Sequence, residues 1–577
     1  MTALAARPLP RRRESDQRHA LVATAHVRLM MLMLLFAAAI LAVILRLAMI
    51  GLLADPQVSH EDRIAAALAR DDIVDRNGSP LARTIEAWTI AVHPKQILGD
   101  RADIARQLAV LMPEHDEAWY LDQLSRNVNF LYLDRHAAPS LVNQVHAIGE
   151  PAIVFEHAAE RLYPQSMLAA HVLGYLGPNA KDPDLVEGQA GIERAFEDRL
   201  TNPVDRGNPL ALSLDSRVQA AMESELGQAM DTFQARGAAG VVLDANTGEV
   251  IAMTSMPVFN PNKLQGANRE ALRNNVTQSV YELGSTFKPI TMAAALDDGV
   301  ITNLGQKFDA TAPLHVGAYT IHDERGDPQR WLTVPEILIY SSNVGTARVA
   351  DLMGADRMQK IFRGMGFDTK PDIELREKAH PIWPSYWART TVMTTGFGHG
   401  IAVTPLQLAN AYATLVNGGI WRPTTLLKVA PGSAPQGRRV ISEGTSYKIR
   451  QMLRLIVMKG TGRKGDAPGY RVGGKTGTGE IASGGGYDRS RNIATFAAAF
   501  PMDAPRYVVV AMLDSPQATK DTYGWKTAAW NAAPVVGRVI TRTGAMLGVT
   551  PDESRDIDVS NLTPLLAQTG DKLVDTR

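Results

Sequence analysis

The sequence predicts an α+β protein with a membrane helix, a mixed α/β middle segment and a domain built on a five-stranded antiparallel sheet with helices on both faces. Three observations predict this arrangement. An uncharged apolar run lies near the start of the chain, and short strand and helix patterns alternate after it. Farther on, strand-like segments enclose a helical block, which is typical of a sheet assembled from both ends of one domain. The 577 residues also suffice for two or three folded units.

The apolar run has the composition of a membrane anchor. Leu29–Leu45 is uncharged, and Leu47–Ala54 continues the run after Arg46. Together they exceed the roughly 20 helical residues that cross a bilayer. A cleaved signal peptide or a buried core helix fits less well, because the charged leader is long and no small-x-small cleavage site follows. We therefore expect an uncleaved anchor at residues 29–53.

The charges before the run indicate its orientation. Six arginines precede it: Arg7, Arg11, Arg12, Arg13, Arg18 and Arg28. The positive-inside rule places such a cluster in the cytoplasm. We expect residues 1–28 to form a cytoplasmic tail of a single-pass inner (plasma) membrane protein whose remaining chain is periplasmic.

The bulk composition excludes several classes of function. Lys plus Arg and Asp plus Glu both number 60, so no overall basic charge points to nucleic acid. The chain contains no cysteine, which removes disulfides, thiolate nucleophiles and cysteine-ligated zinc. We expect no metal and no cofactor.

Residues 213–548 show strand patterns at both ends. A helix is predicted at Ser213–Gln234, followed by a hairpin of Gly240–Asp244 and Glu249–Ser255. The other end carries three further strands and a closing helix: Arg471–Gly479, Ile493–Phe500, Arg506–Leu513 and Thr527–Leu547. We expect residues 55–212 to form a separate domain before this one, and residues 549–577 to form a tail.

One segment inside this domain has the pattern of an enzymatic nucleophile. The sequence Gly-Ser-Thr-Phe-Lys-Pro at 284–289 opens an apolar helix, and Ser285 and Lys288 share one helical face. The helix N-terminus favours negative charge that develops at Ser285. A serine hydroxyl needs a base, which Lys288 provides if burial keeps it partly neutral. Taken alone the pair is weak, because a capping serine and a solvent-facing lysine have the same spacing.

Two further motifs in the same domain strengthen the hypothesis. Ser341-Ser342-Asn343 follows an apolar helix, and Lys475-Thr476-Gly477-Thr478 lies on a predicted strand. The triplet alone means little, because Ser125-Arg126-Asn127 has the same form outside this domain. The order and placement of all three motifs in one domain carry the interpretation.

With these motifs the sequence resembles the penicillin-binding proteins. Three earlier segments look like the pedestal motifs of class B, the branch without a glycosyltransferase: Asp75-Arg76-Asn77-Gly78, Arg161-Leu162-Tyr163-Pro164 and Gly191-Ile192-Glu193. Gly240–Asn262 and Thr404–Ala409 also match the family. Within class B the likeness is strongest to the FtsI-type cell-division transpeptidases, because the spacing between Asn343 and Lys475 lacks the insertion of the elongation-specific homologue.

The resemblance implies a serine-type D-Ala-D-Ala transpeptidase or carboxypeptidase that cross-links stem peptides of the septal wall and is the target of β-lactams. Ser285 would attack the penultimate D-alanine carbonyl, and Lys288 would take the serine proton. Ser341 would relay a proton to the leaving amine. Asn343 would hydrogen-bond Lys288 or the substrate amide.

The resemblance also implies a binding strand. Lys475, Thr476, Gly477 and Thr478 would hold the terminal carboxylate of the substrate, and the backbone N–H groups of Ser285 and Thr478 would form an oxyanion hole. The implied partners are the inner membrane, a septal glycosyltransferase of the FtsW type and other division proteins. The alternatives are an elongation-specific class B transpeptidase, a β-lactamase or β-lactam sensor, and a non-catalytic division scaffold.

Some residues depart from the family pattern. Arg70-Asp71 stands where Arg-Gly is usual, and Gly479-Glu480 stands where an alanine and often a basic residue are common. We expect the second departure to affect strand-edge geometry or donor preference. His399 replaces an aromatic residue in a glycine-rich loop. Since no paired histidine motif is near it, we interpret it as a loop residue near the cleft and not as a metal ligand.

Overall fold

The computed structural model describes residues 12–53, 70–182, 185–317, 319–324, 326–483 and 486–567. Residues 1–11 of the expected cytoplasmic tail, residues 55–69 at the start of the expected pedestal and residues 568–577 of the expected C-terminal tail lie outside this description.

The predicted anchor lies in one long helix, α1 (Arg12–Leu53). Its apolar stretch, Leu21–Leu47, has 27 residues and a mean hydropathy of 2.6, and none of its most apolar window is buried by protein. At 1.5 Å per residue this stretch is about 40 Å long, which is enough to cross the hydrocarbon core of a bilayer. The helix fits a single-pass membrane protein.

The pedestal begins with a sheet in which one long strand is central. β2 (Pro80–Val92) pairs antiparallel with β4 (Ile153–Leu162) and with β3 (Leu131–Ala137). The short β1 (Ile73–Val74) joins β2 to β7 (Leu210–Ala211), so the chain that enters and the chain that leaves the pedestal meet in one sheet.

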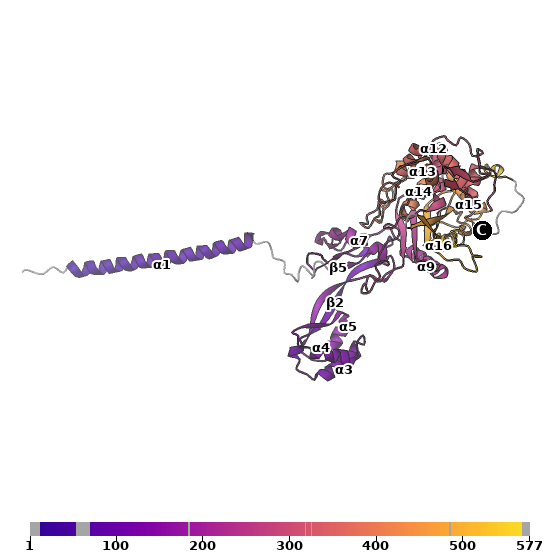
Figure 1. Cartoon of the computed structure of the whole chain (residues 1–577). Helices are drawn as coiled ribbons and strands as arrows, with labels where there is room; N and C mark the ends of the chain where they lie inside the picture. Colours follow the sequence, from indigo (N-terminus) through magenta and orange to yellow (C-terminus); the bar gives the residue numbers. More distant parts are fainter. Residues whose placement is uncertain are drawn as a thin grey trace, which may run out of the picture. The chain divides into compact units, whose positions relative to one another are not determined.

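Three helices cover the far end of β2 and form a small head with its own core. They are α3 (Arg101–Leu111), α4 (Glu117–Ser125) and α5 (Pro139–His146), which lie together at that end of the strand (Figure 1). Leu108 and Leu124 from the helices pack with Ile90 from β2, and all three side chains are fully buried. The triplet Ser125-Arg126-Asn127, which has the same form as Ser341-Ser342-Asn343, lies at the end of α4 in this head.

Two of the three pedestal motifs, those that contain Arg161 and Glu193, meet in a buried ionic network at the other end of the sheet. Glu193 Oε1 accepts from Arg161 Nε at 2.8 Å, and Glu193 Oε2 accepts from Arg70 Nε at 3.0 Å. Asp71, which departs from the family pattern, accepts from Arg199 at 2.8 Å and from the Gly207 amide at 2.9 Å. The carboxylate at position 71 therefore has two partners that a glycine could not bind.

The remaining pedestal elements connect these parts. They are η1 (Pro94–Gln96), α6 (Ala170–Leu173), β5 (Leu176–Pro178), β6 (Val186–Gly188), α7 (Gly191–Ala195), α8 (Glu197–Thr201) and η2 (Pro203–Asp205).

The predicted five-stranded antiparallel sheet of the second domain is confirmed. Its order is β16-β17-β18-β8-β9, so the hairpin from the start of the domain joins three strands from its end. The bounds are β8 (Gly237–Asp244), β9 (Val250–Met256), β16 (Gly473–Ser483), β17 (Gly486–Phe500) and β18 (Tyr507–Asp514). Because β16 has a strand partner on one side only, it is an edge strand.

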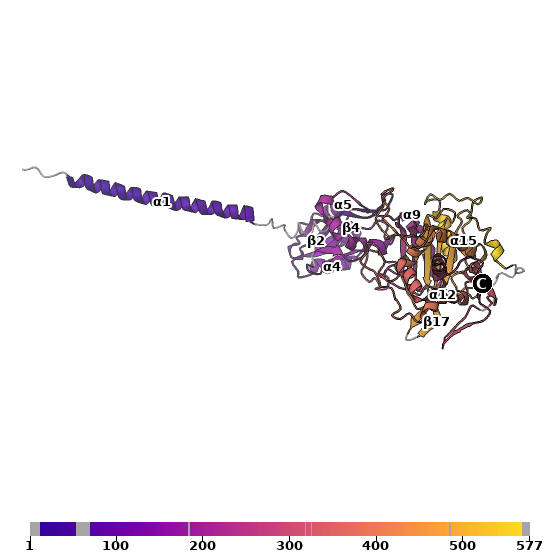
Figure 2. The ribbon, with the colours of Figure 1, turned by 90° about the horizontal axis from the view of Figure 1, so that it is seen from above.

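Helices bury both faces of this sheet, which explains why its strands are apolar at nearly every position. Val241 and Leu243 pack on one side with α14 (Pro405–Val416), whereas Val242 packs on the other side with α9 (Ser216–Phe233) and α16 (Ala532–Thr543). In Figure 2 the helices α9 and α15 (Glu443–Lys459) flank the sheet on opposite sides.

The helical block between the strand groups contains the other elements of the domain. They are η3 (Gly284–Phe287), α10 (Lys288–Asp297), β10 (Lys307–Asp309), β11 (Leu314–Val316), β12 (Tyr319–Ile321), β13 (Trp331–Thr333), α11 (Val334–Ile339), α12 (Asn343–Gly364), α13 (Arg389–Thr395), β14 (Ile420–Trp421), β15 (Arg438–Arg439) and η4 (Arg463–Gly465). The last element is η5 (Thr563–Leu565), and the nearby Ile557 and Leu562 are buried in the domain core.

Candidate active site

The predicted nucleophile lies where a short 3-10 turn becomes a helix. Ser285 is in η3 and half-buried, and Lys288 opens α10 with its side chain fully buried. Pro289 occupies the first turn, where its missing N–H leaves no hydrogen bond unmade. Gly284 has φ +54°, a conformation that residues with a Cβ seldom adopt. The turn therefore fixes the direction of Ser285 before the helix begins.

The edge strand β16 lies against this turn with almost no space between the two backbones. A Cβ at Gly477 would lie 2.3 Å from the carbonyl oxygen of Leu283, and one at Gly479 would lie 1.8 Å from that of Glu282. The alanine that is common in the family at position 479 would therefore require the backbone to shift. The close contact brings Thr478 beside Gly284 and thus next to Ser285.

The hydroxyl of Ser341 lies between two buried ammonium groups. Lys288 Nζ donates to Ser341 Oγ at 3.1 Å and also to the Ser341 carbonyl oxygen. Lys475 Nζ donates to the same Oγ at 2.9 Å and to the Thr476 carbonyl at 2.9 Å. Ser341 has φ +61°, a strained conformation for a residue with a Cβ, of the kind found at functional sites. The structure thus joins three predicted site residues through one oxygen atom.

Burial and mutual repulsion favour loss of a proton from this lysine pair. Burial lowers the pKa of Lys288 to about 8, and the carboxylates of Asp323, Glu324 and Asp327 oppose that shift. Burial and the positive charge of Lys288 hold the pKa of Lys475 well below its ordinary value. A neutral Lys288, which can accept a proton, is therefore accessible near neutral pH.

Asn343 lies in the site, and its side-chain amide has a protein partner other than Lys288. Its side-chain amide donates to the backbone carbonyl of His322 at 3.0 Å, and not to Lys288. Ser342 caps α12, and Asp323 accepts from the Ser342 hydroxyl at 2.7 Å and from the Val344 amide at 2.9 Å. The segment around Asp323 therefore positions the whole Ser-Ser-Asn motif.

These groups surround a cavity of about 650 Å³. Among the predicted residues, Ser285, Ser341, Asn343, Thr476 and Thr478 line it. The other three lie beneath the surface of the cavity, since Lys288, Lys475 and Gly477 are buried.

One wall of this cavity consists of residues that no sequence motif predicts. Thr461 Oγ1 lies 2.7 Å from Thr476 Oγ1, and the basic residues next to it in the chain also line the cavity: Lys459, Arg463 and Lys464. Trp530 lines it as well, with Lys464 Nζ 4.0 Å from the centre of its ring. No motif marks these residues. The residues at 459–464 reach the cavity through the packing of α15 against β16, and Trp530 comes from the segment just before α16.

His399 and Glu480 also line the cavity. Burial lowers the pKa of His399, and the carboxylate of Glu480 opposes that shift. His399 is thus a loop residue beside the cleft, as predicted. In the part of the chain that the structure describes, no cluster of three or more His, Cys, Asp or Glu side chains is placed to hold a metal ion.

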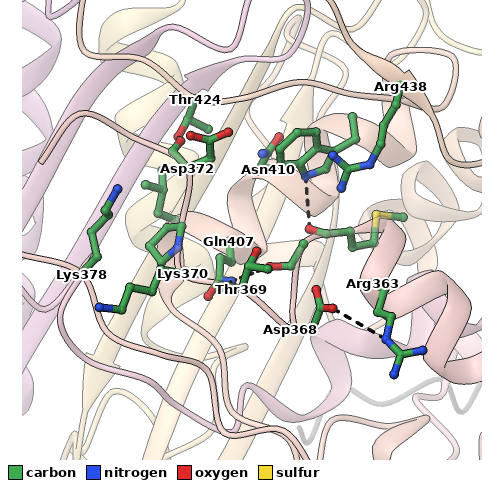
Figure 3. Close-up of a pocket in the computed structure, with 15 residues that line it drawn as sticks. Arg363, Asp368, Thr369, Lys370, Asp372, Lys378, Gln407, Asn410, Thr424 and Arg438 are labelled. Atoms are coloured by element: carbon green, nitrogen blue, oxygen red, sulfur yellow. Dashed lines mark hydrogen bonds and ion pairs between the residues drawn. The ribbon is translucent and has the colours of Figure 1, made fainter. Parts of the chain in front are cut away.

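A second cavity, of about 440 Å³, shares no lining residue with the first (Figure 3). Gln407 from the Thr404–Ala409 motif forms part of its wall and donates to the carbonyls of Gly366 at 2.7 Å and Thr369 at 2.8 Å. Trp421 closes another side and donates to Met365 O at 3.2 Å. The Thr404–Ala409 motif therefore has a structural role here, because Gln407 holds the loop at Gly366 and Thr369 through these hydrogen bonds.

Comparison with known proteins covers both domains. The model of the penicillin-binding protein dimerisation domain matches residues 66–203, and that of the penicillin-binding protein transpeptidase domain matches residues 238–536. A probable peptidoglycan D,D-transpeptidase FtsI of Caulobacter vibrioides is 39% identical over 491 residues, which cover 83% of this chain and 82% of that protein. The peptidoglycan D,D-transpeptidase FtsI of Escherichia coli K12 is 31% identical over 516 residues, 84% of each chain.

A solved structure supports the fold. The peptidoglycan synthetase from Bifidobacterium adolescentis aligns with a TM-score of 0.64 at 22% identity and covers 85% of this chain and 97% of that one. The two domain matches and the identity over most of the chain, together with the pedestal and the five-stranded sheet, show that the chain belongs to the class B penicillin-binding proteins.

Proposed function

We propose that this protein is a peptidoglycan D,D-transpeptidase that cross-links stem peptides through an acyl-enzyme on Ser285. The observation that carries the proposal is the single network in which Lys288 and Lys475 both donate to Ser341 Oγ beneath the cavity that Ser285 lines. The relatives named as D,D-transpeptidases support the same reaction.

In the first half-reaction, the Ser285 hydroxyl oxygen attacks the carbonyl carbon of the penultimate D-alanine. Neutral Lys288 takes the hydroxyl proton, which its lowered pKa allows. The carbonyl oxygen becomes negative and is stabilised by the backbone N–H groups of Ser285 and Thr478. Ser341 passes a proton to the departing amine, and the terminal D-alanine leaves.

In the second half-reaction, an amine from a neighbouring stem peptide attacks the Ser285 ester. A new amide bond forms, and the serine oxygen regains its proton through Lys288. Lys475, Thr476 and Thr478 hold the carboxylate of the donor before it leaves, and Gly477 permits the close contact of β16 with the serine turn. Asn343 lines the cavity and binds the donor amide.

Labelling with a fluorescent penicillin tests the acyl-enzyme. Wild type and the control Ser433→Ala, which changes an exposed serine outside the cavity, should label equally. Ser285→Ala should not label at all. An adduct that survives in Ser285→Ala would remove the serine from its role, and rapid turnover of the penicillin would instead favour a β-lactamase.

We further propose that the enzyme acts in septal wall synthesis, with its N-terminus in the cytoplasm, its catalytic domain in the periplasm and a septal glycosyltransferase as partner. The arginine cluster before the apolar stretch and the relatives named FtsI support this proposal. A tagged full-length chain should concentrate at midcell. Localisation along the lateral wall would favour the elongation role, and septal cross-linking that persists in Ser285→Ala would favour a non-catalytic scaffold.

A further inference from the structure

We propose that the second cavity, shown in Figure 3, binds a compact ligand with two or more negative charges and that the bound ligand speeds acylation of Ser285. The charged groups are phosphates or carboxylates, both of which basic side chains bind through charge-assisted hydrogen bonds. The cavity volume of about 440 Å³ is within the range of small-molecule sites. Only the effect on acylation rests on the proposed function, because it takes Ser285 as the nucleophile.

The lining of this cavity carries more positive than negative charge. Four of its side chains are basic and two are acidic: Arg363, Lys370, Lys378, Arg438, Asp368 and Asp372. Arg363 Nε lies 3.7 Å from Asp368 Oδ2, so these two charges offset each other. Within the described parts of the chain, no carboxylate forms an ion pair with Lys370, Lys378 or Arg438. Because Asp372 alone cannot neutralise three cations, the cavity attracts anions.

Arg438, from β15, is held in position before any ligand binds. Its guanidinium lies 3.7 Å from the centre of the Trp421 ring, and one of its nitrogens donates to the Gly364 carbonyl at 2.9 Å. A guanidinium has five N–H donors, so others remain for the oxygen atoms of a ligand. Partial burial lowers the pKa of Arg438, and the carboxylates of Asp368 and Asp372 oppose that shift. An anion placed beside this guanidinium therefore supplies negative charge that the protein provides only in part.

The two lysines lie on a different side of the cavity. Figure 3 shows Lys370 and Lys378 at the left and Arg438 at the upper right. Both lysines belong to the segment after α12, and Lys378 Nζ donates to the Ile373 carbonyl at 2.8 Å, which fixes its direction. A ligand with one charged group can contact one of these sides, whereas a ligand with two can contact both. The placement of the cations therefore favours a dianion over a monoanion.

One wall of the cavity packs against the turn that carries Ser285. This wall includes lining residues within positions 363–368, and Phe362 and Phe367 lie in or beside the same stretch. The ring centre of Phe287 lies 5.6 Å from that of Phe362 and 5.2 Å from that of Phe367. All three rings are fully buried, so a shift of this wall reaches the serine turn through direct contact.

A second wall holds the same turn through a hydrogen bond. This wall is the start of α14, which contributes Leu406, Gln407 and Asn410 to the lining. Farther along the same helix, the buried Tyr412 hydroxyl donates to the Thr286 carbonyl at 2.9 Å. Because Thr286 directly follows the nucleophile, both walls of the cavity restrain the serine turn.

A ligand that contacts both walls restricts their movement relative to each other. The serine turn then varies less in position, and a nucleophile held in its attacking geometry reacts faster. An anion in the catalytic cavity would have the opposite effect, because it would compete with the carboxylate of a penicillin for the basic residues there. The sign of the rate change therefore distinguishes the two places where an anion could bind.

Two probes test the site on the detergent-solubilised full-length chain at fixed ionic strength. Pyrophosphate carries phosphate charges and citrate carries carboxylate charges, and isothermal titration calorimetry measures the Kd of each. Binding of both supports a site for either group, and binding of one identifies the group that the site accepts. Acetate, which can contact only one side, should bind at least about fivefold more weakly.

Variants locate the bound probe. Lys370→Gln and Arg438→Gln should each raise the Kd about fivefold, as expected for one partly exposed ion pair, and Lys370→Arg should keep the wild-type value. Asp372→Asn removes a carboxylate from the lining and should lower the Kd, which a merely structural role would not explain. The matched control Lys448→Gln removes an exposed cation outside both cavities and should change nothing.

The effect on the active site is measured with a fluorescent penicillin. A saturating probe should raise the second-order rate constant for labelling roughly fivefold, a modest effect for coupling between two sites, and should not do so in the Lys370→Gln/Arg438→Gln double variant. The absence of binding by both probes, or binding that the double variant retains, overturns the site. A labelling rate that the bound probe leaves unchanged or lowers overturns the coupling. An enzyme that fails to label at all refutes the proposed function, whereas calorimetry still tests the site.

Discussion

The pH dependence of acylation follows from the environment of Lys288. If neutral Lys288 takes the serine proton, the acylation rate is proportional to its neutral fraction. With the pKa lowered to about 8 by burial, that fraction is about 1% at pH 6, about 10% at pH 7 and one half at pH 8. The rate should therefore rise roughly 50-fold from pH 6 to pH 8 and level off above pH 9.

The buried pair of Lys288 and Lys475 determines whether the acylation rate rises or falls with pH. Lys475 also has a lowered pKa and repels a charge on Lys288, so the loss of one proton makes it easier for the other lysine to keep its own. The proposed mechanism needs the form of the pair in which Lys288 is neutral, and that form becomes more populated as the pH rises. An alkaline rise is the result, and not an acidic one.

The assay is the second-order rate constant for a fluorescent penicillin between pH 6 and pH 9, with thermal unfolding at each pH as the control for folding. Asp323→Asn should move the midpoint to lower pH, because the Asp323 carboxylate raises the pKa of Lys288. Asp351→Asn, at a carboxylate that pairs with Arg389 outside the cavity, should leave the midpoint in place. A rate that stays constant between pH 6 and pH 8 in folded enzyme would refute the assignment of Lys288 as the base.

Three substitutions extend these expectations. Ser341→Ala removes the oxygen between the two lysines and should slow penicillin acylation by roughly 100-fold or more, with unchanged thermal unfolding of the protein. A wild-type rate would exclude proton transfer through Ser341. Glu193→Gln leaves the buried Arg70 and Arg161 without the carboxylate that pairs with both. It should lower the free energy of unfolding by about 3–5 kcal/mol, measured by denaturant titration. An unchanged free energy of unfolding would show that this ionic network does not stabilise the pedestal. Gly479→Ala places a Cβ 1.8 Å from Glu282 O, so it should destabilise the domain by about 1–3 kcal/mol and slow acylation; an alanine variant that matches wild type in both would contradict the close contact.

The sheet could be predicted from sequence because its strands are buried on both faces. Runs such as Tyr507–Asp514 are apolar at almost every position, which marks them without any knowledge of their partners. The predicted ends of the helices and strands agree less well with the structure. The closing helix was expected at Thr527–Leu547, but α16 is Ala532–Thr543, because Asn531 caps the helix through its own side chain.

The contacts within the site could be predicted only in part. Ser285 and Lys288 are three residues apart, so their common helical face follows from local geometry. The acceptor for Asn343 could not be foreseen, since His322 lies 21 residues away in a segment without a distinctive pattern. Thr461 was missed for the same reason, because its contact with Thr476 depends on how a helix end packs against the sheet.

The order of strands in the sheet has a consequence for how the domain is made. β8 pairs with β18, so Gly240 must find Ala511 across about half the chain. Such non-local pairing makes folding slow, because loop closure must precede any stabilising contact. Until residue 514 has been synthesised, the β8–β9 hairpin presents an unpaired apolar edge, of the kind that aggregates. A chain truncated before β18 should therefore be insoluble even though the serine, both lysines of the site and the pedestal are all present.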